Sequence, residues 1–321
     1  MDPETPSETD TLAGTTPPEQ VKYPNPFIVT PTTPHTHTII LLHGRGSNGP
    51  KFGTEFITSP TSTGATLQTT LPFAKWIFPT AKKRRAVLFK RIPINQWFDI
   101  YDINNQSYRE HLQVDGLQET TELVHTLIEE EIRSGIPAER IVVGGLSQGC
   151  AASLYAMLCY KRRIGGYIGM CGWLPFAKYV EGCLGISLSE GDPGDDMFET
   201  LDDEESPGFF EKSDESNGNE GERAKNPTME AIGFLKDNIS FPISDDDRLE
   251  VLQTPVFLGH GALDEKVQFR LGEQARDALK GLGFKVTWEG YDDLGHWYKI
   301  PEEIDHIKEF LTNTLGIQSS D

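Results

Sequence analysis

The stretch that decides the fold is Ile141-Val142-Val143-Gly144-Gly145-Leu146-Ser147-Gln148-Gly149-Cys150-Ala151-Ala152-Ser153. Its apolar beginning is typical of a strand buried on both faces of a parallel sheet, and the small residues after Gly149 favour a helix. Between the two, Gly145 to Gly149 fits the pattern G-x-S-x-G. A serine on such a tight turn stands clear of the sheet, because the flanking glycines let strand and helix approach closely. The stretch therefore predicts a parallel sheet with Ser147 exposed at the carboxyl end of a strand.

The rest of the chain alternates between strand-like and helix-like segments. Short apolar runs predict further strands, and apolar residues spaced near 3.6 predict helices between them. Such alternation is typical of βαβ units, so we expect an α/β fold with a mostly parallel central sheet and helices on both faces. The expected strands are 38–42, 76–78, 166–170, 255–259 and 285–288, and the expected helices are 117–132, 151–158, 267–282 and 304–311.

The composition excludes several classes of protein. The 321 residues include 29 Lys and Arg against 49 Asp and Glu, a net charge of −20, which argues against a nucleic-acid partner because such partners need a basic surface. No apolar run approaches the ~20 residues of a membrane span, so we expect at most peripheral membrane contact. Met1 to Glu4 do not resemble the start of a signal peptide. Four cysteines without a C-x-x-C spacing predict free thiols, no metal site and a cytoplasmic location.

The acidic charge is concentrated in one part of the chain. Residues 190–250 contain 20 acidic and 5 basic residues, and the segment to Asn226 is poor in apolar residues. Such a segment buries too little apolar surface to offset the entropy of ordering it. We therefore expect a single domain over 37–315 with an acidic, mobile insertion at about 186–247, an extended N-terminal tail over 1–36 and a C-terminal tail over 316–321. A docking loop or a cation site is an alternative interpretation of the insertion.

A serine hydroxyl needs a base and an orienting acid to act as a nucleophile. In the hydrolase order Ser, Asp or Glu, His, three histidines follow Ser147. His296 comes just after the last expected strand, whereas His260 lies within a strand end and His306 on the polar face of a helix. Asp264 follows the expected strand that ends near Leu258, where a carboxylate points into the ligand crevice. We predict that His296 is the base and Asp264 the acid, in preference to Asp292 and Asp293, which suit a solvated turn.

The oxyanion of such a reaction needs two N–H donors. The residue after the nucleophile, Gln148, supplies one, and the loop after an early strand supplies the other, so we predict the backbone N–H of Arg45. The Arg45 side chain is also placed to meet an acidic group of a substrate. The same loop, Gly44 to Gly49, fits the dinucleotide pattern G-x-G-x-x-G. No Asp or Glu follows between Glu55 and Asp99 to hold a ribose, and Pro50 and Gly53 do not favour a helix, so we reject a nucleotide cofactor and expect none.

Further short motifs stand near these residues, and several are rich in aromatic residues. Trp97 and Phe98, with Trp173 and Leu174, are candidates for the wall of an acyl groove, although such aromatics also suit an ordinary core. The run Lys82 to Arg85 suits either a solvated loop tip or a contact with anionic lipid head groups. The motifs are Leu42-His43-Gly44-Arg45-Gly46, Gln96-Trp97-Phe98-Asp99, Gly135-Ile136-Pro137-Ala138-Glu139-Arg140-Ile141, Cys171-Gly172-Trp173-Leu174-Pro175, Gly261-Ala262-Leu263-Asp264-Glu265-Lys266-Val267 and Gly295-His296.

Together with the Ser147 turn, these motifs resemble the phospholipase/carboxylesterase family, and within it the acyl-protein thioesterases. The resemblance implies a compact α/β-hydrolase fold and a nucleophile, acid and base at Ser147, Asp264 and His296. It also implies hydrolysis of acyl thioesters on lipidated proteins, of small carboxylic esters and of lysophospholipids. Two departures are the long acidic segment after Pro175 and Arg45, which stands where the family usually has a small or apolar residue.

Two hypotheses follow from different classes of protein. The first is a serine esterase or thioesterase that works through an acyl-enzyme intermediate. The alternative is a catalytically silent hydrolase-fold module that binds a partner through the acidic insertion. An intact set of Ser147, Asp264 and His296 favours the enzyme.

Overall fold

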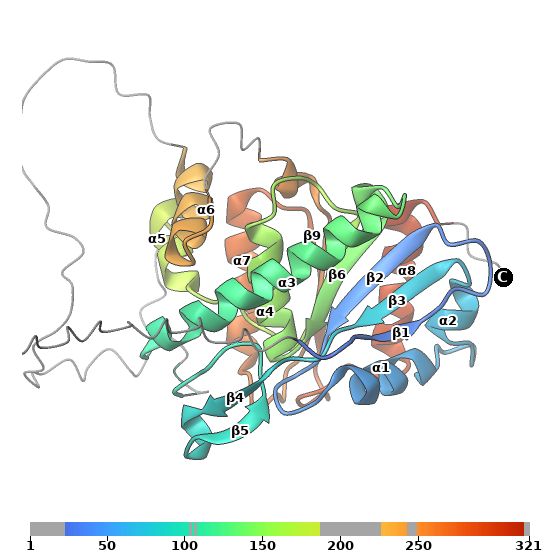
Figure 1. Ribbon diagram of the computed structural model, residues 1–321, viewed down its shortest axis with the longest axis horizontal. Helices are drawn as coiled ribbons and strands as arrows, with labels where there is room; N and C mark the ends of the chain where they lie inside the picture. Colours follow the sequence, from blue (N-terminus) through green and yellow to red (C-terminus); the bar gives the residue numbers. More distant parts are fainter. Residues whose placement is uncertain (1–22, 103–104, 106–107, 187–225, 243–248, 318–321) are drawn as a thin grey trace, which may run out of the picture.

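A single seven-stranded sheet organises the computed structural model, which describes residues 23–102, 105, 108–186, 226–242 and 249–317 (Figure 1). The strand order is β1-β3-β2-β6-β7-β8-β9, and every neighbouring pair except β1–β3 is parallel. A separate antiparallel hairpin, β4–β5, projects beside the sheet. The strands are β1 Phe27–Val29, β2 His37–Leu42, β3 Ala74–Phe78, β4 Lys83–Ala86, β5 Ile92–Asn95, β6 Ile141–Leu146, β7 Gly166–Met170, β8 Val256–Gly261 and β9 Val286–Tyr291.

Helices cover both faces of this sheet. One face packs against α3, α4 and α7, with α5 and α6 packed against α7 and α4, and the other face packs against α1, α2 and α8. The α-helices are α1 Gly49–Thr58, α2 Leu67–Thr70, α3 Val114–Arg133, α4 Gln148–Leu158, α5 Ala177–Leu184, α6 Pro227–Asn238, α7 Phe269–Leu282 and α8 Glu302–Leu315.

The apolar runs of the strands follow from burial on both faces. In β2, Ile39 and Leu41 belong to the core on the α1 and α8 side, whereas Ile40 and Leu42 belong to the core on the α3 and α4 side. Side chains of a strand alternate between faces, so a strand covered on both sides is apolar throughout. The predicted α/β class, with a mostly parallel sheet and helices on both faces, is confirmed.

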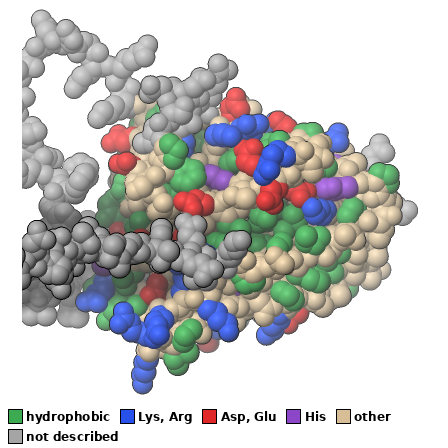
Figure 2. Space-filling view, viewed as in Figure 1, with side chains coloured by type: hydrophobic (Ala, Val, Ile, Leu, Met, Phe, Trp, Pro, Cys, Tyr) green, Lys and Arg blue, Asp and Glu red, His purple; other side chains and the backbone are tan. Residues whose placement is uncertain are grey.

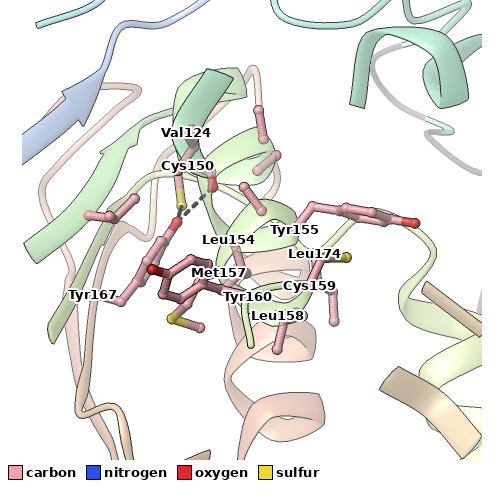
Figure 3. Close-up of a cluster of buried hydrophobic side chains, with 14 of the residues drawn as sticks. Val124, Cys150, Leu154, Tyr155, Met157, Leu158, Cys159, Tyr160, Tyr167 and Leu174 are labelled. Carbon is pink, nitrogen blue, oxygen red and sulfur yellow. Dashed lines mark hydrogen bonds between the residues drawn. The ribbon is translucent and has the colours of Figure 1, made fainter. Parts of the chain in front are cut away.

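Helix α4 lies at the centre of the larger core. All eleven of its residues are buried, because the sheet and neighbouring helices surround it (Figure 3). The small residues Ala151 and Ala152 let it pack close to the sheet. The Tyr167 hydroxyl of β7 donates to the Cys150 carbonyl at 2.6 Å, which satisfies a buried polar group where helix and sheet meet. The helix that begins at the Ser147 turn is therefore held rigidly.

The described part of the chain departs from the expected boundaries in two places. Residues 27–29, within the expected tail, form β1, which pairs with β3 at the sheet edge. Residues 227–238, within the expected insertion, form α6, whose Ala231 and Leu235 are fully buried. The rest of those predictions, at 1–22, 187–225, 243–248 and 318–321, lies outside the described residues.

Helix α1 contradicts the expectation that Pro50 and Gly53 disfavour a helix. Asn48 caps the helix by accepting from the Lys51 N–H at 2.8 Å, and Pro50 occupies the first turn, where its missing N–H is of no consequence. Gly53 leaves the space that the Phe27 and Phe78 rings occupy. The lack of an Asp or Glu between Glu55 and Asp99 therefore remains the argument against a dinucleotide site.

The four cysteines are free, and none forms a disulfide. Within the described residues, every helix is too short or too polar to cross a membrane.

Lys and Arg side chains gather over the β4–β5 hairpin, at the lower left of Figure 2. The run Lys82 to Arg85 thus belongs largely to a strand rather than to a loop tip.

Helix α6 provides a test of the boundary of the domain. Replacing the buried Leu235 by Ala should lower the free energy of unfolding by about 2–5 kcal/mol, because it leaves a cavity against α4. The same change at the exposed Met229 of this helix should have an effect below about 0.5 kcal/mol. Denaturant unfolding measures both. Equal effects of the two substitutions would mean that α6 is not part of the folded core.

Candidate active site

Ser147 stands on a strained turn between β6 and α4. Its backbone φ is +57° and its ψ is −123°, a conformation that side-chain-bearing residues rarely adopt. A Cβ on Gly145 would lie 2.6 Å from the Leu42 carbonyl oxygen, and one on Gly149 would collide with the carbonyl oxygens of Leu42 and His43. Both positions therefore require glycine, and the turn lifts the Ser147 hydroxyl above the carboxyl edge of the sheet.

Three side chains from separate loops form a continuous chain of hydrogen bonds at this edge. His296 Nε2 lies 2.9 Å from Ser147 Oγ, and His296 Nδ1 lies 2.7 Å from Asp264 Oδ2. Asp264 follows β8 and His296 follows β9, so parallel strands bring both loops to the end of β6. The structure thus brings together the three residues that the sequence analysis singled out.

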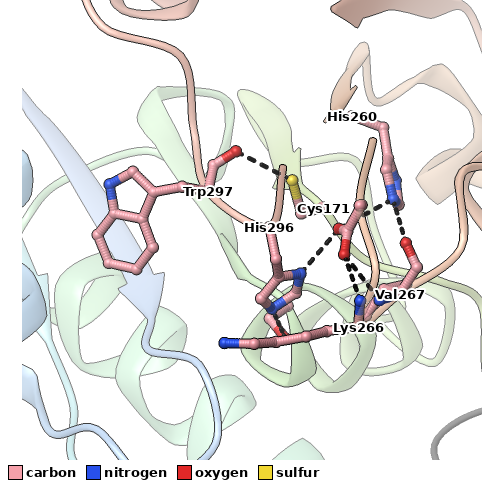
Figure 4. Close-up of polar contacts among 8 residues, drawn as sticks. Cys171, His260, Lys266, Val267, His296 and Trp297 are labelled. Carbon is pink, nitrogen blue, oxygen red and sulfur yellow. Dashed lines mark hydrogen bonds and ion pairs between the residues drawn. The ribbon is translucent and has the colours of Figure 1, made fainter. Parts of the chain in front are cut away.

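The Asp264 carboxylate is fully buried and heavily hydrogen-bonded (Figure 4). Its Oδ1 accepts from the backbone N–H groups of Lys266 at 2.8 Å and Val267 at 2.9 Å. Burial alone would raise its pKa, but the hydrogen bonds from His260, His296 and the Val267 N–H outweigh burial and hold the pKa below its usual range. Asp264 is therefore an anion that fixes the Nδ1–H tautomer of His296.

The other candidate histidines and acids serve different contacts. His260 Nε2 lies 2.8 Å from the Val267 carbonyl and 3.4 Å from Asp264 Oδ2, so it donates from behind the carboxylate. His306 Nδ1 contacts the Tyr291 hydroxyl at 3.0 Å. The exposed Asp293 pairs with Lys299 at 2.7 Å. His260 therefore supports Asp264. The signal in the sequence for this contact is that His260 stands only four residues before Asp264.

The loop after β2 lies beside Ser147. A Cβ on Gly44 would be 3.5 Å from Ser147 Cβ. The His43 ring accepts the Ala81 N–H at Nε2, so its Nδ1–H donates to the Gly44 carbonyl at 2.7 Å. Burial lowers the pKa of His43 to about 4, against the smaller opposing effect of the Gly44 carbonyl, which keeps the ring neutral.

This hydrogen bond orients the Arg45 N–H. In a trans peptide the carbonyl and the following N–H point in opposite directions, so a Gly44 carbonyl held by His43 and the Ser47 N–H turns the Arg45 N–H the other way. The Gln148 N–H begins α4, where backbone N–H groups lack partners within the helix. Within the described part of the chain, neither N–H donates to another protein group.

Gln148 and Trp97 connect this loop to the turn. The Gln148 side-chain amide accepts from the Trp97 N–H at 3.1 Å and donates to the Phe98 carbonyl at 2.8 Å. The Trp97 indole donates to the His43 carbonyl at 2.7 Å. Trp97 and Phe98 are fully buried, and these bonds connect the backbone of the loop after β2 to the start of α4.

A pocket of about 430 Å³ opens above Ser147 and His296. Trp173 lines it, as predicted. Trp97, Phe98 and Leu174 do not line it, because their side chains pack into the core, so the prediction that they form the groove is wrong. The walls that sequence reasoning missed are mainly apolar and come from α1, the β4–β5 hairpin, the end of β6 and the loops: Phe52, Phe89, Ile94, Ile100, Leu146 and Trp297.

Cys171, His260 and Asp264 place three potential metal-ligating atoms within 4.8 Å of one another. Each atom already has a hydrogen bond: Cys171 Sγ donates to the Trp297 carbonyl at 3.1 Å, and His260 donates to Val267. The hydrogen bonds of these three residues therefore serve to hold Asp264 and the loop that carries His296 in position.

Several hydrogen bonds fix the loop that carries His296. Besides Cys171, the Tyr298 hydroxyl bonds Ser59 at 3.1 Å, and the Lys299 N–H donates to Glu303 Oε2 at 2.8 Å. The Glu303 side chain is fully buried beside Gly259, and its Oε1 has no hydrogen-bond partner. Burial raises the pKa of Glu303 to about 8, the Lys299 N–H opposes this, and the charge of Glu289 adds to it.

Comparisons with known proteins show which proteins this chain is similar to. Residues 23–185 match the family model described as Phospholipase/Carboxylesterase. Acyl-protein thioesterase 1 of Schizosaccharomyces pombe is 35% identical over 160 residues, which cover 50% of this chain and 66% of that protein. Acyl-protein thioesterase 1 of Gibberella zeae is 27% identical over 292 residues, covering 90% of this chain and 95% of that protein. The crystal structure of Zea mays acyl-protein thioesterase 2 superposes with a TM-score of 0.60 at 27% identity, covering 92% of this chain and all of that chain.

Glu303 gives the stability of the protein a predictable pH dependence. Its pKa is about 8 in the fold against an ordinary 4.5, so between these values the folded protein binds more protons than the unfolded chain. Stability should therefore fall as pH rises from 4.5 to 8, by at most about 1.4 kcal/mol per pH unit from this group. Glu303→Gln should remove that part of the slope, as measured by urea unfolding at several pH values. Identical slopes for the wild type and the variant would contradict the assignment, and Glu302→Gln is the exposed control on the same helix.

Proposed function

The chain belongs to the phospholipase/carboxylesterase family and has the α/β-hydrolase fold, and from this premise we propose that Ser147, His296 and Asp264 are the catalytic residues with which it hydrolyses acyl thioesters or carboxylic esters. The protein is a serine hydrolase of the thioesterase/carboxylesterase type. The observation that carries the assignment of residues is the unbroken chain of hydrogen bonds from Ser147 to Asp264, open to an apolar pocket.

The reaction proceeds through a covalent acyl-enzyme. Ser147 Oγ attacks the acyl carbonyl carbon while His296 Nε2 takes the hydroxyl proton. The imidazolium that results is stabilised by the buried Asp264 anion. When the tetrahedral intermediate collapses, His296 gives its proton to the leaving thiol or alcohol. Water then attacks the acyl-enzyme, activated by the same histidine, and Ser147 is regenerated.

The oxyanion of each tetrahedral intermediate binds to the backbone N–H groups of Arg45 and Gln148. The bond from His43 to Gly44 and the position of Gln148 at the start of α4 support this role. Donors that are oriented before the reaction need no reorganisation when charge develops, and each is typically worth ~10²–10³ in turnover.

Acyl thioesters, including those of lipidated proteins, are the substrates that the relatives' names suggest. The mainly apolar pocket suits an acyl chain. The β4–β5 hairpin, with exposed Phe89 and Ile92 beside several cations, suits a peripheral contact with a membrane surface. Four unpaired cysteines favour a cytoplasmic location. The mechanism requires no cofactor, metal or nucleic acid.

The alternative, a catalytically silent binding module, has less support. A binding surface needs neither a strained serine nor a buried carboxylate aligned behind a histidine. The strained serine costs stability, and that cost is reasonable only where the chemistry uses it; the aligned carboxylate and histidine are typical of a catalytic site.

Removing the nucleophile is the primary test. Ser147→Ala should lower the turnover of p-nitrophenyl butyrate by about 10⁶ and abolish labelling by a fluorophosphonate probe. The exposed Ser134 provides a control, since Ser134→Ala should retain both. Activity within tenfold of the wild type in Ser147→Ala would refute the assignment.

The acid is tested by changing its charge while keeping its shape. Asp264→Asn should lower kcat by about 10³–10⁴, because an amide no longer stabilises the imidazolium or fixes the tautomer of His296. Fluorophosphonate labelling should slow in parallel. A matched change at the exposed Asp293, Asp293→Asn, should leave kcat unaltered. Equal kcat values for the two variants would mean that Asp264 is not the orienting acid.

A further inference from the structure

The pocket has the opposite charge from the rest of the protein. The chain carries a net charge of −20, yet the residues that line the pocket include two cations, Arg45 and Lys266, and no Asp or Glu. Hydrolysis of a neutral ester needs neither cation, because the oxyanion is served by backbone N–H groups. The two side chains therefore call for an explanation outside the proposed catalytic steps.

Arg45 is a partly buried cation that forms no ion pair with any described residue. Its guanidinium lies 5.0 Å from the centre of the Phe89 ring, and its Nη1 atom is buried with no hydrogen-bond acceptor. Burial lowers the pKa of Arg45, while Asp99 opposes this from a distance. The Asp99 carboxylate instead accepts from backbone and side-chain N–H groups around it. A buried donor without an acceptor is costly, and a ligand that supplies the acceptor removes the cost.

Lys266 approaches the pocket from the side of Asp264 and His296. Its backbone N–H donates to Asp264 Oδ1 at 2.8 Å, which fixes the position of the residue. The exposed side chain runs past the His296 ring, as Figure 4 shows, and lines the same pocket as Arg45. Within the described part of the chain its ammonium group has no ion-pair partner. Two loops thus bring unpaired positive charge to the reacting centre.

We propose that the pocket selects substrates that carry an anionic group close to the scissile acyl bond, bound by Arg45 and Lys266. This inference rests on the proposed function and specifies its substrate class. The attraction acts at short distance, because the two cations line the same pocket as Ser147 and His296. It is also strong, because the apolar walls reduce screening by solvent. The pocket lining contains no Asp or Glu, so an anionic group that reaches Arg45 and Lys266 meets no repelling carboxylate there.

Matched substrate pairs test the proposal and distinguish the two places where the anion can sit. In the leaving-group arm, S-hexanoyl-3-mercaptopropionate is compared with its neutral amide, S-hexanoyl-3-mercaptopropionamide. In the acyl arm, p-nitrophenyl hydrogen glutarate is compared with p-nitrophenyl hexanoate. The readout is the ratio of kcat/KM for the anionic substrate to kcat/KM for the neutral one.

The wild type should prefer the anionic member at least tenfold in one arm, and the preference should decline with added salt. Arg45→Met and Lys266→Met should each reduce the ratio about threefold or more, and the double variant should bring it to one or below. The ratio is insensitive to a general loss of rate, such as a disturbed Arg45 N–H would cause. Lys51→Met removes a cation of α1 that does not line the pocket and should leave the ratio unchanged.

A ratio of one or below in both arms of the wild type would overturn the proposal, as would a preference that survives in the double variant. If Arg45→Met fails to fold, Lys266→Met and the salt dependence of the wild type still decide it. The neutral substrates report the proposed function separately. If the neutral substrates are hydrolysed and the anionic ones are not preferred, only the proposed anion site is overturned. If no substrate is hydrolysed in a Ser147-dependent way, the proposed function is overturned.

Discussion

The close approach of α4 to the ends of β2 and β6 is the constraint on which the site depends. Gly145 and Gly149 make it possible, since a methyl group at either position would meet the backbone of Leu42. The approach forces Ser147 into its positive φ, points its hydroxyl out of the sheet and brings the start of α4 beside the loop that contains Gly44. The burial of the whole of α4 supplies the packing energy that keeps this strained turn in place.

A second requirement is electrostatic. The Asp264 anion is stable inside the protein because two backbone N–H groups and two histidines surround it. A buried carboxylate with fewer donors would take up a proton, as Glu303 does with its single hydrogen bond. The two acids lie beneath the same loop and have opposite pKa shifts. The number of donors, rather than burial alone, therefore decides which acid remains charged and is able to stabilise an imidazolium.

Sequence reasoning succeeded where local pattern and burial coincide. The central strands β2, β6, β7 and β8 read as apolar runs because both of their faces are covered. The three residues of the hydrogen-bonded chain follow strand ends in a recognisable order. It failed where the deciding contact is tertiary. Helix α6 sits within an acidic segment and owes its place to a few residues such as Leu235. Trp97 looks like a groove aromatic, but its indole bond to the His43 carbonyl places it in the core.

The β4–β5 hairpin shows why the pocket could not be derived from periodicity. Its strands are only four residues long, β4 is mostly charged and β5 contains Pro93, so they give no clear strand signal. Phe89 and Ile94 from this unit nevertheless form part of the pocket wall. The Phe89 ring also lies under the Arg45 guanidinium. The hairpin therefore shapes the apolar wall, holds one cation at the reacting centre and presents further cations outside. The hairpin and the pocket thus both carry cations, in a chain whose net charge is −20.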